Sequence, residues 1–150
     1  MTGRLDTICD NGLQFYSKIS ASISHDVKNA LAIINENAGL LDDFTMMADQ
    51  GMPIDPERLK ILATMIGKQV GRANDIAHNM SRLAHSLDQS IAVADLNETL
   101  QLLTTLTGRL LKMRNLTMGI SESSHSLKVE TSPFFLMILI WHLLDCAAAA

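Results

Sequence analysis

Apolar residues recur every three or four positions over the first half of the chain, which predicts two long amphipathic helices. The first series runs from about residue 13 to residue 47, with Ser20 and Asn37 as polar interruptions. The second series runs from residue 59 to residue 87, with Gln69 as its polar interruption. A helix that is apolar along one stripe buries that stripe against another element. The spacing therefore predicts that the two segments pack together.

The residues between these two segments predict a short turn. Gly51 suits the position after a helix, Asp55 is a good N-cap, and Pro56 fits the first turn of the next helix. The result is an antiparallel helical hairpin. A single hairpin leaves part of each stripe exposed, whereas two hairpins bury both stripes in a four-helix bundle, so we expect a homodimer. A bundle completed within the chain by its later helices is the alternative.

After a polar joint at residues 86–90, the pattern changes to shorter elements. Residues 91–93 fit either a short strand or a linker. The elements predicted next are a helix opened by the capping box Asp95–Glu98, strands at 116–120 and 127–129 around the turn-rich residues 121–126, and a very apolar helix from Phe134 to the end. We thus expect a mainly α chain, with a helical hairpin domain at residues 1–88 and the first, incomplete part of an α/β sandwich at residues 89–150.

Composition narrows the class of protein. The 150 residues are 47% hydrophobic but only 4% aromatic, with nine Met, which favours helices packed by aliphatic side chains. A net charge of −4 gives no general attraction for nucleic acid. Cys9 and Cys146 are too few for a disulfide framework or a metal site, so we expect a cytoplasmic protein. No export signal is visible, and the most apolar stretch, 134–144, is shorter than the about 20 residues of a membrane helix.

His25 is the candidate functional residue of the first helix. At about 100° per residue, the imidazole lies opposite the apolar face, beside Asp26 and one turn before Asn29. The apolar face consists of Ile23, Val27, Ala30 and Ile34. An exposed imidazole next to a carboxylate and an amide suits a reaction with another macromolecule, although most isolated surface histidines have no such role. The other histidines are expected to be ordinary residues: His78 and His85 at the surface, His125 in a turn and His142 in the core, bonded to a neighbour.

The string His25-Asp26-x-Lys28-Asn29, followed by an apolar run, resembles the phosphoacceptor box of two-component sensor histidine kinases. Ala30 stands where many members have proline, which removes a helix bend and no chemical group. The resemblance implies that His25 accepts a phosphoryl group and passes it to the receiver-domain aspartate of a response regulator. It also implies that Asp26 orients or deprotonates the imidazole, that Asn29 positions the phosphoryl group or a water, and that Lys28 offsets phosphate charge.

Residues 93–116 resemble the start of the ATP-binding catalytic domain of the same family, and residues 139–147 line up with its N-box helix. Two asparagines of that helix hold Mg²⁺ and nucleotide phosphate in the family; here the positions are His142 and Cys146. Neither offers the amide oxygen that suits Mg²⁺. The resemblance implies ATP and Mg²⁺ for a complete kinase, but we expect no cofactor in this chain. The chain is then either a fragment of a kinase or a protein with a degenerate nucleotide lobe.

Three functions follow from these patterns. The first is the dimerisation and phosphoacceptor region of a sensor histidine kinase. The complete protein would then be a protein-histidine kinase, and whether this chain alone is an enzyme is left open. The second is a histidine phosphotransferase or adaptor of a phosphorelay that does not use ATP. The third is a helical dimerisation scaffold in which His25 has no chemical role.

Overall fold

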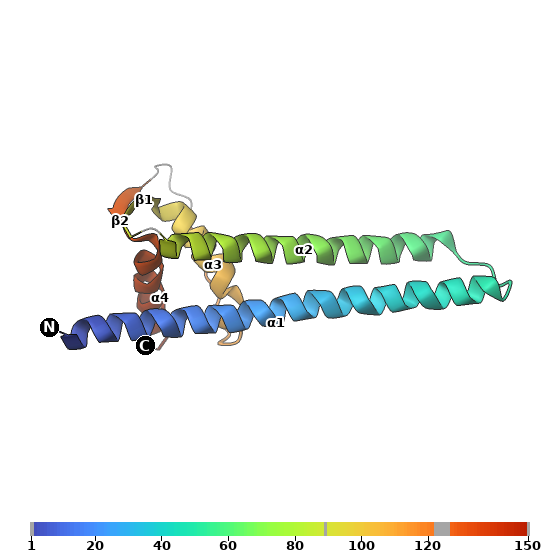
Figure 1. Ribbon diagram of the computed structural model, residues 1–150, viewed down its shortest axis with the longest axis horizontal. Coiled ribbons are helices and arrows are strands. Elements are labelled where there is room, and N and C mark those ends of the chain that lie inside the picture. The colour runs from blue at the N-terminus through green and yellow to red at the C-terminus, as the bar shows by residue number, and fades with distance from the viewer. Residues whose placement is uncertain (1, 89, 122–126, 150) are drawn as a thin grey trace. The chain divides into compact units, whose positions relative to one another are not determined.

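The computed structural model describes residues 2–88, 90–121 and 127–149, which are mainly helical (Figure 1). The elements in chain order are α1 (Thr2–Asp49), α2 (Pro56–Asp88), β1 (Ala92–Asp95), α3 (Leu96–Lys112), β2 (Lys128–Thr131) and α4 (Pro133–Ala149). The chain forms two compact units, to both of which α1 and α2 contribute. The hairpin unit is Ser24–His78, and the mixed unit is Met1–Ile23 with Asn79–Ala150. This division follows packing alone, so the expected domain boundary after residue 88 stays a prediction.

The turn of the hairpin unit joins α1 to α2 (Figure 1), and its residues have the roles predicted for them. Gly51 has a φ of 78°, a conformation that glycine adopts without steric cost, and its N–H donates to the Ala48 carbonyl oxygen at 2.8 Å. Asp55 Oδ1 accepts a hydrogen bond of 2.9 Å from the Glu57 N–H, and α2 begins at Pro56. The predicted helix end, N-cap and helix start are therefore confirmed.

The two helices of the hairpin unit pack through a narrow apolar seam. Ala30 and Leu62 are buried, and Asn37 is the buried polar residue within the seam. The Asn37 side-chain N–H donates to the Ile33 carbonyl oxygen at 2.6 Å, one turn earlier on α1. The predicted polar interruption is thus tolerated because its amide is satisfied by the helix that carries it.

The mixed unit combines a two-stranded sheet with helices. β1 and β2 pair antiparallel, with Ala94 opposite Val129, and α3 follows β1 directly. Asp95 is the N-cap of α3, and its side chain accepts from the N–H groups of Asn97 and Glu98. The predicted capping position is confirmed, and residues 92 and 93 of the predicted segment 91–93 are the first two of β1, as the strand alternative had it.

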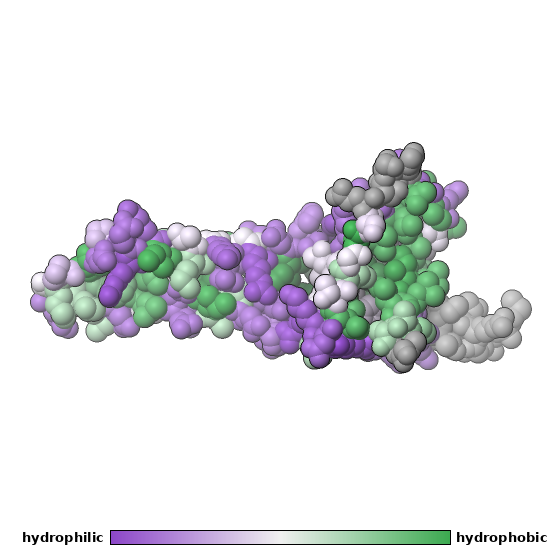
Figure 2. All heavy atoms as spheres, turned by 180° about the vertical axis from the view of Figure 1, so that it is seen from behind, coloured by the Kyte–Doolittle hydropathy of each residue, from purple (hydrophilic) through white to green (hydrophobic). Residues whose placement is uncertain are grey.

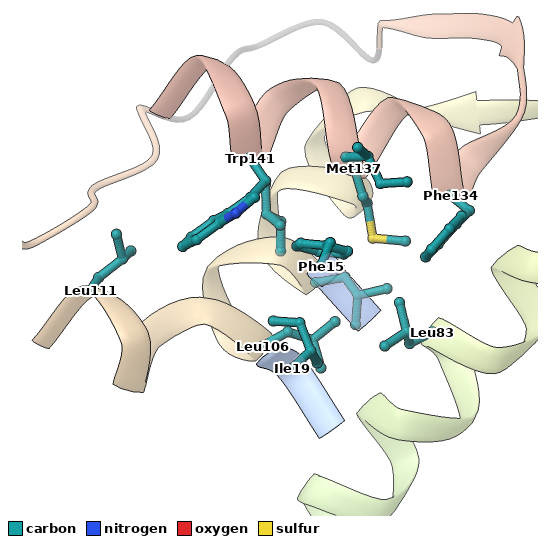
Figure 3. Packing of buried hydrophobic residues seen from close by; sticks show 11 residues of the cluster. Phe15, Ile19, Leu83, Leu106, Leu111, Phe134, Met137 and Trp141 are labelled. Atoms are coloured by element: carbon teal, nitrogen blue, oxygen red, sulfur yellow. The ribbon is translucent and has the colours of Figure 1, made fainter. Parts of the chain in front are cut away.

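The core of the mixed unit is formed by buried side chains from all four helices (Figure 3). Phe15 from α1 lies at its centre, with ring centroids 6.2 Å from Phe134 and 6.0 Å from Trp141, both tilted. Ile19 from α1 and Leu83 from α2 are fully buried beside them. This core joins the start of α1 and the end of α2 to the short elements that follow.

The buried faces of α1 and α2 in the mixed unit differ from the predicted stripes. Leu13 and Leu87 were expected to be buried, but they are 69% and 45% exposed. On α1 the buried positions are instead Phe15 and Ile19, one residue to one side of the predicted series. On α2 Leu83 is buried as predicted, and Ser86 is buried in place of Leu87. The physical reason is that this part of α1 packs against aromatic side chains of α4. That contact buries a face of α1 other than the predicted stripe.

The predicted strand over residues 116–120 is wrong. Burial alternates along it, with Leu116 and Met118 packed against the core, but the segment has no regular secondary structure. An alternating pattern reports which side chains face the core and does not supply a pairing partner. The strand predicted at 127–129 is found as β2, at Lys128–Thr131. Most of the turn predicted between these segments lies outside the described residues.

Candidate functional site

His25 lies on α1 within the hairpin unit, and its side chain is 49% exposed. The apolar residues predicted on the opposite face are all buried or half-buried, with Ala30 completely buried. The predicted exposure of the imidazole is therefore confirmed. Its chemical role is a separate question, which depends on the groups around the ring.

Asn29 lies one turn after His25 and contacts its ring. The two side-chain nitrogens, Asn29 Nδ2 and His25 Nδ1, lie 3.0 Å apart, and the hydrogen-bond roles depend on the tautomer of the ring. An Asn29 N–H that donates to Nδ1 leaves the ring proton on Nε2. If the amide turns over, its carbonyl oxygen accepts from Nδ1–H, and the lone pair is then on Nε2. The amide can therefore stabilise either neutral tautomer.

Asp26 lies further from the ring than Asn29 does. Its Oδ1 is 3.8 Å from His25 Nδ1, beyond the length of a hydrogen bond but within reach of an ion pair with a protonated ring. The carboxylate side chain is 27% exposed. At this distance Asp26 acts on the imidazole through its charge, and Asn29 makes the shorter contact.

Arg72 on α2 is a site residue that the sequence analysis missed. Its Nη2 lies 3.8 Å from Asp26 Oδ1, so it reaches the site from the other helix of the hairpin. Counting back from the turn would not have found it, because Asp26 lies 23 residues before the end of α1 and Arg72 lies 16 residues after the start of α2. No motif of α2 marks the residue either. Lys28, in contrast, is exposed on α1, with its predicted role resting on its position beside Asn29.

His142 and Cys146 lie on α4 of the mixed unit, so the structure assigns them to a different unit from His25. His142 Nε2 is buried but has no hydrogen-bond partner within the parts of the chain that the structure describes, so the expected bond to a neighbour is not found at this atom. Cys146 is exposed and free. An imidazole and a thiol at these positions provide no oxygen ligand for a phosphate-bound Mg²⁺.

The α4 residues between these two positions have a structural role. Asp145 forms an ion pair with Arg114, whose guanidinium lies 5.9 Å from the centre of the Trp141 ring. The hydrogen bond from Arg114 lowers the pKa of Asp145 below its usual value, and the charges of Arg114, Lys18 and His142 act in the same direction. This contact ties the segment after α3 to α4.

The mixed unit also has an open pocket of about 270 Å³ next to β1 and the start of α3. Its polar lining includes Arg82, His85, Asp95 and Glu98, so both signs of charge are present. Asp95 is already used as the N-cap of α3, and His85 Nδ1 lies 3.7 Å from Asp88. The pocket therefore offers no uniform chemistry for one class of ligand.

The remaining predicted histidines are as expected where the structure describes them. His78 and His85 are exposed on α2, and His125 lies outside the described residues. In residues 2–88, 90–121 and 127–149, no three His, Cys, Asp or Glu side chains come close enough to hold a metal ion. Within the same ranges, no helix has the length and apolar character required to cross a membrane.

Comparison with the models of known protein families gives no match, and comparison with functionally characterised proteins gives none either.

Proposed function

We propose that this chain is the dimerisation and phosphoacceptor region of a two-component sensor histidine kinase, with His25 as the phosphorylated residue. The observation that carries the proposal is an exposed imidazole on a helical hairpin, with Asn29 3.0 Å from Nδ1 and Asp26 as a charged neighbour. The order of these residues is the one that resembles the family's phosphoacceptor box.

The proposed reaction is phosphoryl transfer to His25 Nε2. The Nε2 lone pair forms the N–P bond, while the bond from phosphorus to the leaving group breaks and its electron pair departs with that group. This requires that the ring proton is on Nδ1. The Asn29 carbonyl oxygen favours that tautomer, because it accepts a hydrogen bond from Nδ1–H when this side of the amide faces the ring. The ring becomes positively charged as the bond forms, and the Asp26 carboxylate stabilises that charge.

The proposed partner is the receiver domain of a response regulator. A phosphoryl group on an exposed ring is accessible to a second protein, whose aspartate would attack phosphorus and leave the histidine neutral again. The complete kinase would use ATP and Mg²⁺, but the imidazole of His142 and the thiol of Cys146 do not fit that cofactor. The proposed reaction therefore uses no group of the mixed unit.

We also propose that the hairpin dimerises into a four-helix bundle. The supporting observation is that the hairpin unit exposes several large apolar residues, and Figure 2 shows apolar surface between its polar side chains. These residues are Leu31, Leu40, Met46, Met47, Met52, Leu59, Ile61, Met65 and Val70. Sedimentation of the purified chain should give twice the monomer mass, and Ile61→Glu should shift it toward the monomer. A monomer at all concentrations would reject the dimer.

The second candidate is a phosphotransferase or adaptor that receives its phosphoryl group from a partner and never from ATP. The residues at positions 142 and 146 favour it, because they lack the oxygen ligands of a nucleotide-bound Mg²⁺. Both candidates use the same reaction at His25 and differ only in the donor.

The test is radiolabel transfer to the full chain, with His25→Gln as the matched control. The donors are Mg-ATP alone, Mg-ATP with a separate intact histidine-kinase catalytic domain, and a phosphorylated receiver domain. Acid-labile label on the wild-type chain but not on His25→Gln supports His25 as the phosphoacceptor. Label from Mg-ATP alone would contradict the inference that His142 and Cys146 do not fit nucleotide-bound Mg²⁺. Absence of label with every donor would leave the dimerisation scaffold as the function.

A further inference from the structure

One carboxylate oxygen links the two helices of the hairpin unit at the His25 site. Asp26 Oδ1 lies 3.8 Å from His25 Nδ1 on α1 and 3.8 Å from Arg72 Nη2 on α2. The oxygen is therefore equally distant from a ring that can gain a proton and from a guanidinium that is always charged. The Arg72 and Asp26 side chains are 49% and 27% exposed, so the contact is partly screened by water.

We infer that Arg72 is a positioning residue for His25 that acts through Asp26. This inference rests on the proposed function, since the protonation state of the imidazole matters only if His25 reacts. Arg72 attracts the Asp26 carboxylate and so limits how strongly this carboxylate stabilises the protonated ring. A larger fraction of His25 then keeps the neutral imidazole that phosphoryl transfer requires.

Other charged groups near this contact must be separated from its effect. On α1 the nearest is Lys28, two residues after Asp26, and on α2 Lys68 and Asp75 lie within one turn of Arg72. None of them is removed by substitution of Arg72 or Asp26. A double-mutant cycle on these two residues therefore isolates the contact between them.

The first measurement is an NMR titration of the His25 ring in the full chain, with the resonance assigned by its loss in His25→Gln. Arg72→Gln should raise the titration midpoint of His25 by roughly 0.3 to 0.5 pH units, because the carboxylate is released toward the ring. Arg72→Lys keeps the charge and should restore most of the wild-type midpoint. In an Asp26→Asn background, Arg72→Gln should move the midpoint by less than half as much.

The second measurement is the rate of His25 phosphorylation by potassium phosphoramidate, in which Nε2 bonds to phosphorus and ammonia leaves with its electron pair. Arg72→Gln should slow the reaction about two- to threefold near pH 6, where protonation limits the rate. At about pH 8.5, where the ring is neutral, the variant should be at least as fast as wild type, because the released Asp26 carboxylate can stabilise the charge that forms on the ring. Damage to the fold would slow it at every pH. Arg58→Gln is the matched control, since it removes the same charge about 20 Å along α2.

Three results would overturn the inference: an unchanged His25 midpoint in Arg72→Gln, an equal shift in the Asp26→Asn background, or a pH-independent loss of rate. If the wild-type chain is not labelled at His25 at all, the proposed function fails. The titration still decides whether Arg72 acts on the ring through Asp26, so the two failures can be told apart.

Discussion

His25 Nδ1 and Asn29 Nδ2 lie 3.0 Å apart on successive turns of α1, so the imidazole ring is held by a residue of its own helix. Residues four apart on a helix lie on the same face, and this contact therefore needs no other part of the chain. The segment from His25 to Asn29 therefore supplies both the imidazole of the candidate site and its shortest described side-chain contact. Among the contacts described above, α2 contributes to the site only through Arg72, which lies near Asp26.

Asn29→Ala should reduce the rate of His25 phosphorylation about three- to tenfold, since a hydrogen bond contributes about 0.5–1.5 kcal/mol. The loss arises because Asn29, with its amide turned so that the carbonyl oxygen faces Nδ1, favours the proton on that nitrogen, and alanine cannot. The measurement is the initial rate with potassium phosphoramidate. Asn35→Ala, an exposed position on the same helix, is the control and should react at the wild-type rate. Equal rates for the two variants would contradict the role of Asn29.

The parts of the fold that the sequence predicts are those set by local chemistry. Asp55 and Asp95 cap their helices, and Gly51 has the positive φ that ends α1. Each of these roles depends on backbone groups within a few residues. The exposure of His25 was predictable for the same reason, because helical periodicity alone places it opposite the apolar face.

The parts that the sequence did not predict depend on distant partners. Phe15 is buried and Leu13 exposed because of aromatic side chains on α4, more than 100 residues later in the chain. Leu116 has the alternating neighbours of a strand but no strand to pair with. Arg72 belongs to the His25 site only because of the register between α1 and α2. A single sequence does not encode such pairings in any local pattern.

Leu103→Ala should destabilise the mixed unit by about 3 kcal/mol, because it leaves a cavity in a well-packed core. Leu103 on α3 is completely buried, and Trp141 in the same core is the one tryptophan of the chain. Urea unfolding followed by Trp141 fluorescence therefore reports this unit. Leu143→Ala makes the same chemical change at a side chain that is 62% exposed and should alter stability by less than about 0.5 kcal/mol. Similar losses in both variants would contradict the described core.

Asp95→Ala should destabilise the mixed unit by about 1 kcal/mol, because it removes the acceptor at the N-terminus of α3. Asp95 Oδ1 lies 2.8 Å from the backbone nitrogen of Asn97 and 3.3 Å from the backbone nitrogen of Glu98. Asp95→Asn retains an acceptor oxygen and should keep most of the stability. Amide hydrogen exchange at residues 97 and 98 is the direct measurement. Faster exchange in the alanine variant alone is expected, and unchanged exchange there would rule out the cap.

Asp145→Asn should reduce the stability of the mixed unit at neutral pH and have no effect in strong acid. The hydrogen bond from Arg114 lowers the pKa of Asp145 below 3.8. A carboxyl group whose pKa is lower in the folded than in the unfolded state contributes stability above its unfolded-state value, and that stability is lost as pH falls through the folded-state value. Because both side chains are more than one-third exposed, the difference at neutral pH should be only about 0.5 kcal/mol.

The measurement for Asp145 is urea unfolding of wild type and variant, followed by Trp141 fluorescence from about pH 7 to about pH 2. The wild type should be the more stable at neutral pH, and the two curves should converge below pH 3.8, where the carboxyl group is progressively protonated. Arg114→Gln removes the other partner, so its difference from wild type should also become smaller in acid, but a constant part should remain because the contact with the Trp141 ring is lost at every pH. A difference between wild type and Asp145→Asn that stays constant down to the lowest pH would mean that the charge of Asp145 does not stabilise this unit.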